Sequence, residues 1–463
     1  MPRSQTSLRM LQARRMGWLA IALIAVVVAV SLTACKPEVG ADGAKLQGHH
    51  GGSAGPADKN AVSASVTPTV LDATKIAPTK GDSFFSAPSD AHQTILKVIQ
   101  QAKTSLDIVN YRLSDPDVIK ALKIAAGNGV AVRVILDQGI LDQQDTLLKK
   151  NNATSLSDDL TAAKVLVKPS PKGFPISHQQ TVVADGQTAL ITSMDLVTSD
   201  VYQVTRDFGL ETQDKDVIAD MKLVFDLDWS NSGSSKSDTP RTGDKTSRLI
   251  WSPIAAANGS KAKILGLIDS AKETIHVETE YLSDGDVIKH LLDMANKGVS
   301  VSVLTPGCVA GRKNPLLNRT LVNQLSSPQN QNKVSAAPPT VKSPYIHGKM
   351  ILVDGTTFFI GSESLSVVAL TKSRELGILT SDVTMGNILE AQFQSDWVNA
   401  LNPSDVTKAN CEGVTGPYAD DNPDLPATSD QPDPLADPKK TPHNGHRIGV
   451  TTTPEAGAKP VTQ

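Results

Sequence analysis

The sequence predicts an α/β fold made of two repeated domains, related by pseudo-two-fold symmetry, each with a largely parallel sheet flanked by helices. Its 463 residues suffice for two or three domains or for one fold duplicated. Residues 102–120 recur as 271–289, and the offset, 271 − 102 = 169, holds throughout both stretches. Within each copy, segments of helical periodicity alternate with short β-branched runs, which is typical of α/β units. The chain is therefore predicted to be a duplication of one α/β domain.

Each copy is expected to begin with a helix followed by a strand. The helix is predicted over 91–102 in the first copy and over 262–271 in the second. The β-branched alternation that follows predicts strands over 106–111 and 275–281. We place the first repeat over 81–245 and the second over 246–405.

A second helix and a second strand complete this unit in each copy. Asp115 and Asp284 are placed as the N-caps of the helix, and Gly129 and Gly298 end it. The next strand is predicted at equivalent positions, 130–136 and 299–304. Residues at the ends of such strands and in the following loops are the expected functional ones.

The overall charge of the chain does not point to any class of binding partner. The chain has 45 Lys+Arg and 48 Asp+Glu, a net charge of −3, which gives no global attraction to nucleic acid or to an acidic membrane surface. Aromatic residues make up only 4% of the chain, too few for a platform that stacks single-stranded bases. The composition therefore disfavours nucleic-acid binding, although it does not exclude a cleft that is locally basic.

The first 35 residues have the pattern of a secretory signal. Four arginines precede an apolar run over 18–32, which ends in Leu-Thr-Ala-Cys at 32–35. An uncleaved membrane anchor is the alternative, because the run approaches the roughly 18 residues that span a bilayer. The last four residues resemble the lipobox of bacterial lipoproteins. This resemblance implies a signal peptide over 1–34, acylation of Cys35 as a membrane anchor and, since Lys36 follows, a periplasm-facing location on the outer membrane.

Segments of low complexity flank the two copies. Residues 35–80 are rich in Gly, Ala, Ser and Pro and are predicted to form a flexible tether. Residues 406–463 are predicted to be a disordered, acidic, Pro-rich tail. Besides Cys35, the chain has Cys308 and Cys411, and the spacing leaves open whether these pair in an oxidising compartment or stay separate thiols.

Further along each copy lies a polar motif, again at an offset of 347 − 178 = 169. Its members in the second copy are His347, Lys349, Asp354, Gly361, Ser362 and Ser364. Its members in the first copy are His178, Gln180, Asp185, Thr192, Ser193 and Asp195. The motif surrounds buried strands predicted at 181–184 and 350–353, and second strands predicted at 189–192 and 357–360. The histidine and the residue two positions later share one face.

This pattern resembles the phospholipase D superfamily, whose signature H-x-K-x4-D-x6-G-S-x-N occurs once in each half. The second copy departs from it at Ser364, which stands in place of the asparagine. The first copy departs at Gln180 for lysine, Thr192 for glycine and Asp195 for asparagine. The resemblance covers 81–401, and two motifs in fixed register make it specific.

The resemblance implies a metal-independent phosphodiesterase without a cofactor, and no metal-ligand cluster of recognisable spacing is present. Two imidazoles reach opposite sides of one phosphorus, where one attacks and the other protonates the leaving oxygen. Family precedent makes His178 the nucleophile and His347 the acid, although the more complete motif surrounds His347. Lys349 would bind phosphate. A later acidic residue fixes the imidazole tautomer, a role that falls to Asp207 for His178 and Glu375 for His347.

The departures in the first copy bear on activity. Gln180 offers a neutral hydrogen bond, whereas charge-assisted bonds are about twice as strong, and losing one such contact in a transition state costs on the order of 10²–10³ in rate. Asp195 adds negative charge that repels an anionic substrate, unless it is protonated or bonded to backbone. The site is therefore slow, tuned to another substrate, or inactive.

The remaining motif residues are expected to bind substrate or to support the site. Ser193 and Ser362 are interpreted as pocket hydrogen-bond donors, with Ser364 beside them. Asp185 and Asp354 each precede a glycine in a turn, which favours structural caps over acids that take part in the chemistry.

A strand of the second copy carries polar residues on one face. His276, Glu278 and Glu280 either line the cleft or form an exposed, ion-paired face. Tyr111 and Arg112 take comparable positions in the first copy.

The function that these patterns favour is a lipid-anchored, monomeric phosphodiesterase or phosphatidyltransferase that acts on phospholipid through a phosphohistidine. One alternative is a catalytically inactive binding or scaffold lipoprotein. The other is a nuclease of the same superfamily, which the near-neutral charge disfavours.

Overall fold

The computed structural model describes residues 68, 71–72, 75–198, 202–236, 248–254, 259–306, 325, 334–337 and 344–400, of which 334–337 as backbone only. The predicted signal peptide, Cys35, Cys308, Cys411 and the predicted tail lie outside the described residues, as does most of the predicted tether. Within the described part of the chain, no helix has the length and apolarity to span a bilayer.

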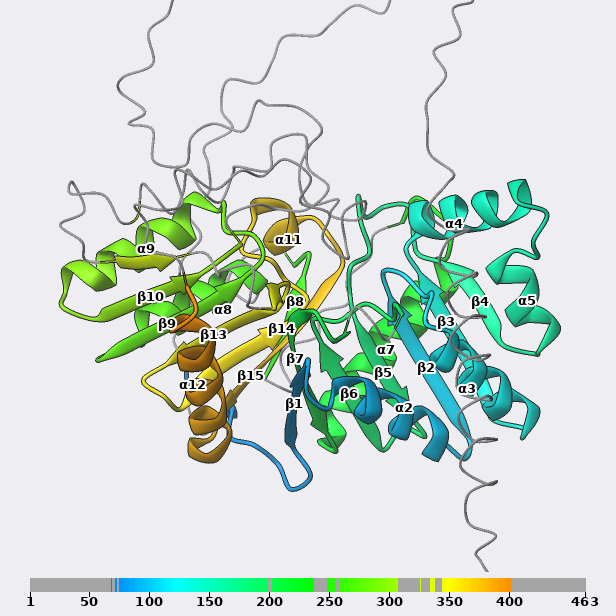
Figure 1. Ribbon diagram of the computed structural model, residues 1–463, viewed down its shortest axis with the longest axis horizontal. Coiled ribbons are helices and arrows are strands. Elements are labelled where there is room, and N and C mark those ends of the chain that lie inside the picture. Colours follow the sequence, from blue (N-terminus) through cyan, green and yellow to red (C-terminus); the bar gives the residue numbers. More distant parts are fainter. Residues whose placement is uncertain are drawn as a thin grey trace, which may run out of the picture. The chain divides into compact units, whose positions relative to one another are not determined.

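The first copy is built around a mixed sheet whose strand order is β1-β7-β6-β5-β2-β3-β4 (Figure 1). Its strands are β1 (Ser83–Ala87), β2 (Ser105–Asn110), β3 (Ala131–Leu136), β4 (Leu166–Pro169), β5 (Thr181–Ala184), β6 (Thr188–Thr192) and β7 (Thr205–Thr212). Its helices are α2 (Ala91–Gln101), α3 (Pro116–Gly127), α4 (Gln138–Lys150), α5 (Leu156–Ala162) and α7 (Lys215–Ser230).

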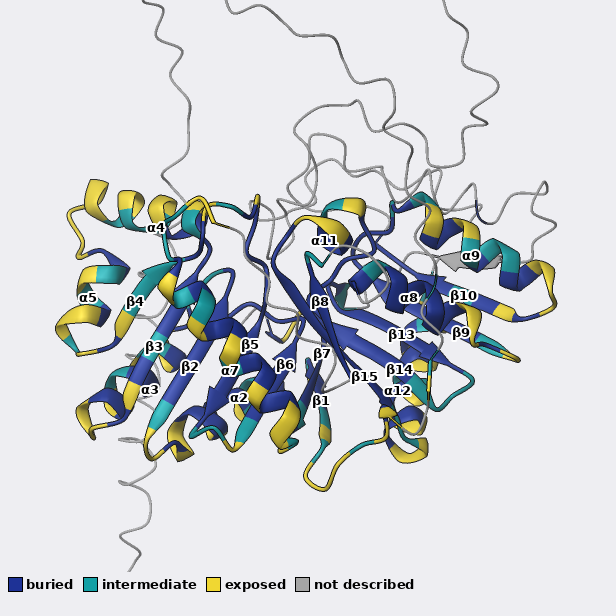
Figure 2. Ribbon diagram, turned by 180° about the vertical axis from the view of Figure 1, so that it is seen from behind, coloured by how far each residue is buried: buried dark blue, intermediate teal, exposed yellow. Residues whose placement is uncertain are grey.

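The second copy repeats this arrangement with strand order β11-β10-β9-β13-β14-β15-β8. Its strands are β8 (Leu249–Ser252), β9 (Thr274–Thr279), β10 (Ser300–Leu304), β11 (Val334–Ala337), β13 (Lys349–Val353), β14 (Thr357–Gly361) and β15 (Glu375–Ser381). Its helices are α8 (Ser260–Asp269), α9 (Gly285–Asn296), α11 (Val367–Thr371) and α12 (Val383–Trp397). Figure 2 shows that the strands are largely buried, whereas α4, α5 and α9 expose their outer faces.

The predicted elements exist, and their ends agree with the structure to within two residues. Asp115 caps α3 by accepting hydrogen bonds from the backbone N–H groups of Asp117 and Val118, and Asp284 caps α9 in the same way. Gly129 and Gly298 follow these helices with φ of 90° and 98°, in the left-handed region that glycine adopts without strain.

The prediction of largely parallel sheets is wrong, because most neighbouring strands run antiparallel. In the first sheet only β2–β3 and β3–β4 are parallel along the main strand order, whereas β1–β7, β7–β6, β6–β5 and β5–β2 are antiparallel. The reason is the tight turn at Asp185, which joins β5 directly to β6 without a helix. Parallel neighbours need a crossover of a dozen or more residues, and the three-residue turns 185–187 and 354–356 are far too short for one, so β5–β6 and β13–β14 are antiparallel.

One apolar core joins the two copies. It contains Ile191 and Phe208 from the first sheet and Phe358 and Ile360 from the second, all fully buried. Separate clusters fill the remaining core of each copy. Because the shared cluster would be open to water in either copy alone, the two halves depend on each other for burial.

A short segment of each copy pairs with the other, as a strand in the second copy and as a single bridge at Ser177 in the first. Strand β12 (Tyr345–Ile346) lies parallel to β7 of the first copy, where the backbone N–H of His347 donates to the carbonyl of Arg206 over 3.1 Å. In the reciprocal contact, the N–H of His178 donates to the carbonyl of Arg374 over 2.9 Å. Each histidine of the motif is therefore held by backbone of the opposite copy.

Two buried ion pairs repeat this exchange. Arg206 of the first copy binds Asp396 on α12 at 2.6 Å, and Arg374 of the second binds Asp228 on α7 at 2.9 Å. The two arginines are 374 − 206 = 168 residues apart, and so are the two aspartates, 396 − 228 = 168. This offset is one residue less than the 169 that separates the histidines. The second copy is thus one residue shorter between its motif serine and this arginine.

We expect Asp228→Ala to lower the free energy of unfolding by about 3–5 kcal/mol, because it leaves the fully buried Arg374 guanidinium without its carboxylate. Urea denaturation measures the loss. The control is Asp293→Ala, which breaks an exposed pair with Lys289 and should change stability by no more than about 0.5 kcal/mol. Equal losses in the two variants would contradict a structural role for the buried pair.

Candidate active site

The two motif histidines lie in one buried site, and each faces a carboxylate of the opposite copy. His347 Nδ1 is 2.7 Å from Asp207 Oδ1, and His178 Nδ1 is 3.4 Å from Glu375 Oε2. The predicted assignment of Asp207 to His178 and of Glu375 to His347 is therefore wrong. The strand exchange explains the difference: it brings His347 beside Arg206, whose chain neighbour is Asp207.

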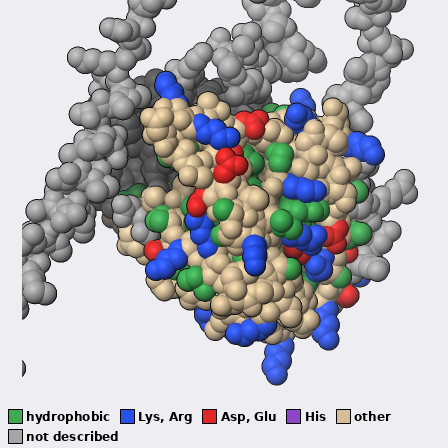
Figure 3. Space-filling model, turned by 90° about the vertical axis from the view of Figure 1, so that its right-hand side faces the viewer, with side chains coloured by type: hydrophobic (Ala, Val, Ile, Leu, Met, Phe, Trp, Pro, Cys, Tyr) green, Lys and Arg blue, Asp and Glu red, His purple; other side chains and the backbone are tan. Residues whose placement is uncertain are grey.

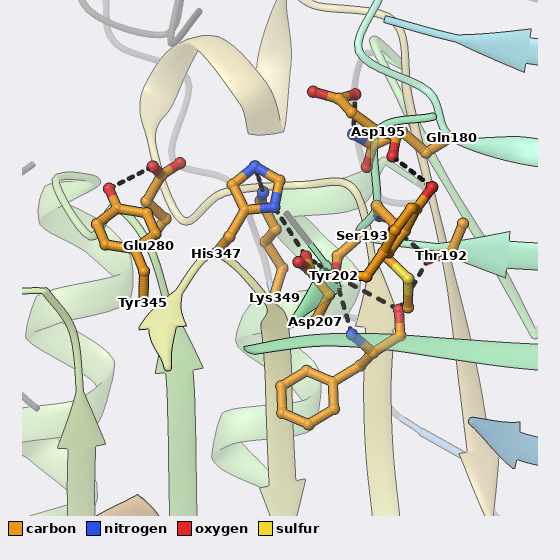
Figure 4. Close-up of polar contacts among 12 residues, drawn as sticks. Gln180, Thr192, Ser193, Asp195, Tyr202, Asp207, Glu280, Tyr345, His347 and Lys349 are labelled. Atoms are coloured by element: carbon orange, nitrogen blue, oxygen red, sulfur yellow. Dashed lines mark hydrogen bonds and ion pairs between the residues drawn. The ribbon is translucent and has the colours of Figure 1, made fainter. Parts of the chain in front are cut away.

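The motif serines hold these carboxylates. Ser193 Oγ donates to Asp207 Oδ1 over 2.8 Å, and Ser362 Oγ donates to Glu375 Oε2 over 2.5 Å. Figure 4 shows Ser193, Asp207 and His347 in one hydrogen-bonded series. Both serines donate to the acid behind a histidine, and their predicted role in binding substrate stays a prediction.

Lys349 lies beside the Nε2 edge of His347. Its Nζ is 3.2 Å from His347 Nε2, and the lysine side chain is buried. The two nitrogens are within hydrogen-bond distance, and the direction of this bond depends on the tautomer of the imidazole ring.

Two of the three departures of the first copy, Gln180 and Asp195, are partners of each other. Gln180 Nε2 donates to Asp195 Oδ1 over 2.6 Å, and both side chains are buried (Figure 4). Tyr202 OH also donates to the backbone carbonyl of Asp195 over 3.0 Å. The corresponding residues of the second copy are Lys349 and Ser364, and Ser364 Oγ makes no hydrogen bond within the described part of the chain. An amide–carboxylate pair therefore stands where the signature has lysine and asparagine.

Asp185 and Asp354 are structural, as predicted. Each has a positive φ, 55° and 50°, and each carboxylate accepts hydrogen bonds from three successive backbone N–H groups that begin β2 or β9. Burial opposes ionisation of Asp185, but these backbone donors outweigh it and lower the pKa of that carboxyl. Both aspartates fix the turn that follows the histidine strand.

The polar strand face of the second copy is buried. His276 Nδ1 is 2.8 Å from Glu390, and its ring stacks on Phe393, so it belongs to the packing of α12. Of the two interpretations left open, an exposed face is wrong for His276, Glu278 and Glu280. Glu280 accepts a hydrogen bond from Tyr345 OH over 2.7 Å, close to His347 (Figure 4).

In the first copy, Tyr111 lies at the site, with its ring centroid 5.0 Å from that of His178. Arg112 is only partly buried.

One acidic residue of the site escaped the sequence analysis. Glu363, between Ser362 and Ser364, is fully buried. A Cβ at Gly361 or Gly377 would come within 2.5 or 2.8 Å of its Oε2, so these glycines make room for the carboxyl. Burial, reinforced by the charge of Glu375, raises the pKa of Glu363 well above its ordinary value. Its position in the variable slot of the signature gave no signal.

This fold, with two histidines from two symmetric copies around one site, defines a member of the phospholipase D superfamily. The family described as "Cardiolipin synthase, PLD-like domain" matches residues 95–229 and 264–397, one match in each copy. The chain belongs to this family and is a phospholipase D-type enzyme.

Its relatives share modest identity over most of their length. Cardiolipin synthase A of Erwinia tasmaniensis is 22% identical over 351 residues, covering 70% of this chain and 70% of that protein. Cardiolipin synthase B of Salmonella typhi is 22% identical over 353 residues, covering 69% and 79%. The crystal structure of phosphatidylserine synthase from Haemophilus influenzae superposes with a TM-score of 0.53 at 13% identity, covering 74% and 94%, and shares the fold.

We expect Glu363→Gln to become more stable relative to the native chain as pH rises. The pKa of Glu363 is raised by folding, so the folded chain holds its proton more tightly than the unfolded chain. The free energy of unfolding of the native chain therefore falls as pH rises from the pKa of Glu363 in the unfolded chain toward its higher pKa in the folded chain. Glutamine does not titrate and removes this contribution.

Urea denaturation at pH 5 and pH 8 measures the difference between the two proteins. Exposed Glu273 is the matched control, and Glu273→Gln should follow the native chain at both pH values. A stability gain of Glu363→Gln that shrinks with rising pH would contradict a buried, protonated Glu363.

Proposed function

We propose that the chain is a phosphatidyltransferase or phosphodiesterase that acts on phospholipid through a phosphohistidine intermediate. The observation that carries this proposal is the pair of buried histidines, each with Nδ1 toward a carboxylate of the opposite copy. In this arrangement Nε2 of each ring points away from the carboxylate that Nδ1 faces. Its relatives are cardiolipin synthases, which supports a phospholipid substrate.

The histidines divide two tasks. The closer carboxylate, Asp207 at 2.7 Å, stabilises a protonated ring better than Glu375 at 3.4 Å. We therefore assign His347 as the acid that protonates the leaving oxygen and His178 as the nucleophile. Lys349 lies beside His347 Nε2 and supplies positive charge for the nonbridging oxygens of the phosphate.

The reaction then balances in two steps. In the first, His178 Nε2 forms a bond to phosphorus, the bond from phosphorus to the alcohol oxygen breaks, and His347 gives its proton to that oxygen. In the second, water or the hydroxyl of a second lipid gives its proton to His347 as its oxygen bonds to phosphorus, and the bond from phosphorus to nitrogen breaks. Water gives hydrolysis, and an alcohol gives transfer.

A single chain supplies both histidines and both carboxylates, which supports a monomeric enzyme. The lipobox-like residues 32–35 support a lipid anchor at Cys35, which would keep the enzyme beside its substrate on the periplasmic side of the outer membrane. The corresponding arrangement is a signal over 1–34, a tether over 35–80, repeats over 81–245 and 246–405, and a tail over 406–463.

The face of the molecule in Figure 3 has no continuous track of positive charge that would support a nucleic-acid substrate. On the face of the molecule in Figure 3, Lys and Arg side chains are separated by acidic, apolar and uncharged ones. Affinity for DNA depends largely on a track of cations along the phosphates. Phospholipid therefore remains the substrate class that the observations favour.

Replacing either motif histidine should abolish turnover. We expect His178→Ala and His347→Ala each to lower hydrolysis of phosphatidylglycerol vesicles by about 10²–10⁴-fold, since each removes a proton-transfer or nucleophilic group. His290→Ala, which disturbs only an ion pair with Asp269 on the outside of the second copy, is the control and should keep full activity.

A second measurement assigns the roles. With bis(p-nitrophenyl) phosphate, whose leaving group needs no proton, His347→Ala should accumulate phosphohistidine at His178, detectable by peptide mass spectrometry. A phosphorylated His347 in the His178→Ala variant would reverse the assignment. Full turnover in both alanine variants would show that the mechanism is wrong.

Restoring the signature should need two changes together. Asp195 accepts a hydrogen bond from Gln180 at 2.6 Å, so a lysine at 180 would form an ion pair with Asp195 instead of binding phosphate. We expect Gln180→Lys alone to change turnover little and Gln180→Lys/Asp195→Asn to raise it by about tenfold or more. Equal effects of the single and double variants would show that Asp195 does not hold residue 180.

A further inference from the structure

Asp195 brings a carboxylate to the two motif histidines. One ligand atom from each of His178, Asp195 and His347 lies within 4.8 Å of the others, and all three side chains are buried. The three are separated by 195 − 178 = 17 and 347 − 195 = 152 residues, so their spacing gave no sign of a cluster. Two imidazoles and one carboxylate are donors that suit Zn²⁺ and similar transition metals.

Each of the three residues is oriented by a further side chain. His347 Nδ1 faces Asp207 at 2.7 Å and His178 Nδ1 faces Glu375 at 3.4 Å. Gln180 donates to Asp195 Oδ1 over 2.6 Å. In metal sites the histidine ligands have their other ring nitrogen hydrogen-bonded to a carboxylate or carbonyl, as His347 has to Asp207, which fixes the tautomer and makes the ligating nitrogen more basic.

The carboxylate of Asp195 occurs in the first copy of this chain and is not part of the signature. The signature has a neutral asparagine at this position, and the second copy has Ser364, neither of which supplies a negative ligand. With asparagine the site would hold two imidazoles and an amide, a much weaker set for a divalent cation. Asp195 is therefore what turns a pair of histidines into a three-ligand set.

Lys349 opposes a cation here. Its ammonium lies 3.2 Å from His347 Nε2, the nitrogen that a metal would use. A metal and this lysine contact exclude each other, so occupancy depends on Lys349 moving away from the ring.

We propose that His178, Asp195 and His347 bind one divalent transition metal, with Zn²⁺ as the probe ion. Bound metal occupies the Nε2 lone pairs that attack phosphorus and relay the proton, so it holds the enzyme in an inactive state. Binding itself is independent of the proposed function, and only the inhibition rests on it.

The test is the zinc stoichiometry of the full-length chain, by equilibrium dialysis and elemental analysis, in the native chain and in Asp195→Asn. We expect the native chain to hold one more tightly bound Zn²⁺ than Asp195→Asn, whose affinity at this site falls by more than about 100-fold. Ligands elsewhere in the chain are the same in both proteins and cancel in the comparison.

A matched control comes from a second cluster, His92, Asp115 and Asp117, which also gathers possible ligands among the described residues. His92→Gln should keep the zinc that Asp195→Asn loses. Co²⁺ in place of Zn²⁺ should give visible absorption bands in the native chain and in His92→Gln, and weaker bands in Asp195→Asn. If Asp195→Asn does not fold, as judged by thermal melting without metal, His178→Gln replaces it.

Lys349→Met should raise the affinity for Zn²⁺, whereas Asp195→Asn lowers it. It removes the competing ammonium, so Zn²⁺ should bind about tenfold more tightly. Equal zinc content in the native chain and Asp195→Asn, or no bound zinc in the native chain, would overturn the proposal.

Activity is a separate measurement. Zinc should inhibit hydrolysis of phosphatidylglycerol by the native chain, and a chelator should restore it. An absence of turnover without zinc would contradict the proposed function and leave the metal site to be judged by its stoichiometry.

Discussion

The structure depends on the backbone contact by which each motif histidine is held in the opposite copy. His347 donates its N–H to the carbonyl of Arg206, and His178 donates to that of Arg374. The residue after each arginine is the carboxylate that faces the crossing histidine. Since a strand fixes the direction of successive side chains, this one contact determines which acid meets which imidazole. The two chemical groups thus come together through β-pairing and not through loops.

The same exchange accounts for the rest of the interface. The arginines that accept the histidine backbone turn their guanidinium groups to Asp396 and Asp228, on the last helix of the opposite copy. The apolar cluster that includes Phe208 and Phe358 fills the space between the sheets. Backbone hydrogen bonds, ion pairs and apolar packing therefore all join the two copies where the site lies. The site is held as rigidly as a protein core.

The sequence predicted much of this fold because its signals are local. Helix caps such as Asp115, glycine stops such as Gly129 and the register of the two histidines each depend on neighbouring residues. Strand direction was missed because the turn at Asp185 is too short for a helix, a feature of backbone geometry. The pairing of Asp207 with His347 was missed because both orders of pairing satisfy the same spacing. The Gln180–Asp195 bond was missed because two departures from a signature were weighed separately.

The crossed carboxylates also bear on how such a protein is made. An amino-terminal half that has left the ribosome, or has passed through a membrane, carries His178 but not Glu375, and it carries Asp207 without His347. Neither imidazole is then oriented for attack on a phosphodiester. The pairing of each imidazole with its carboxylate therefore needs both copies, so a product truncated before the second copy cannot assemble this site.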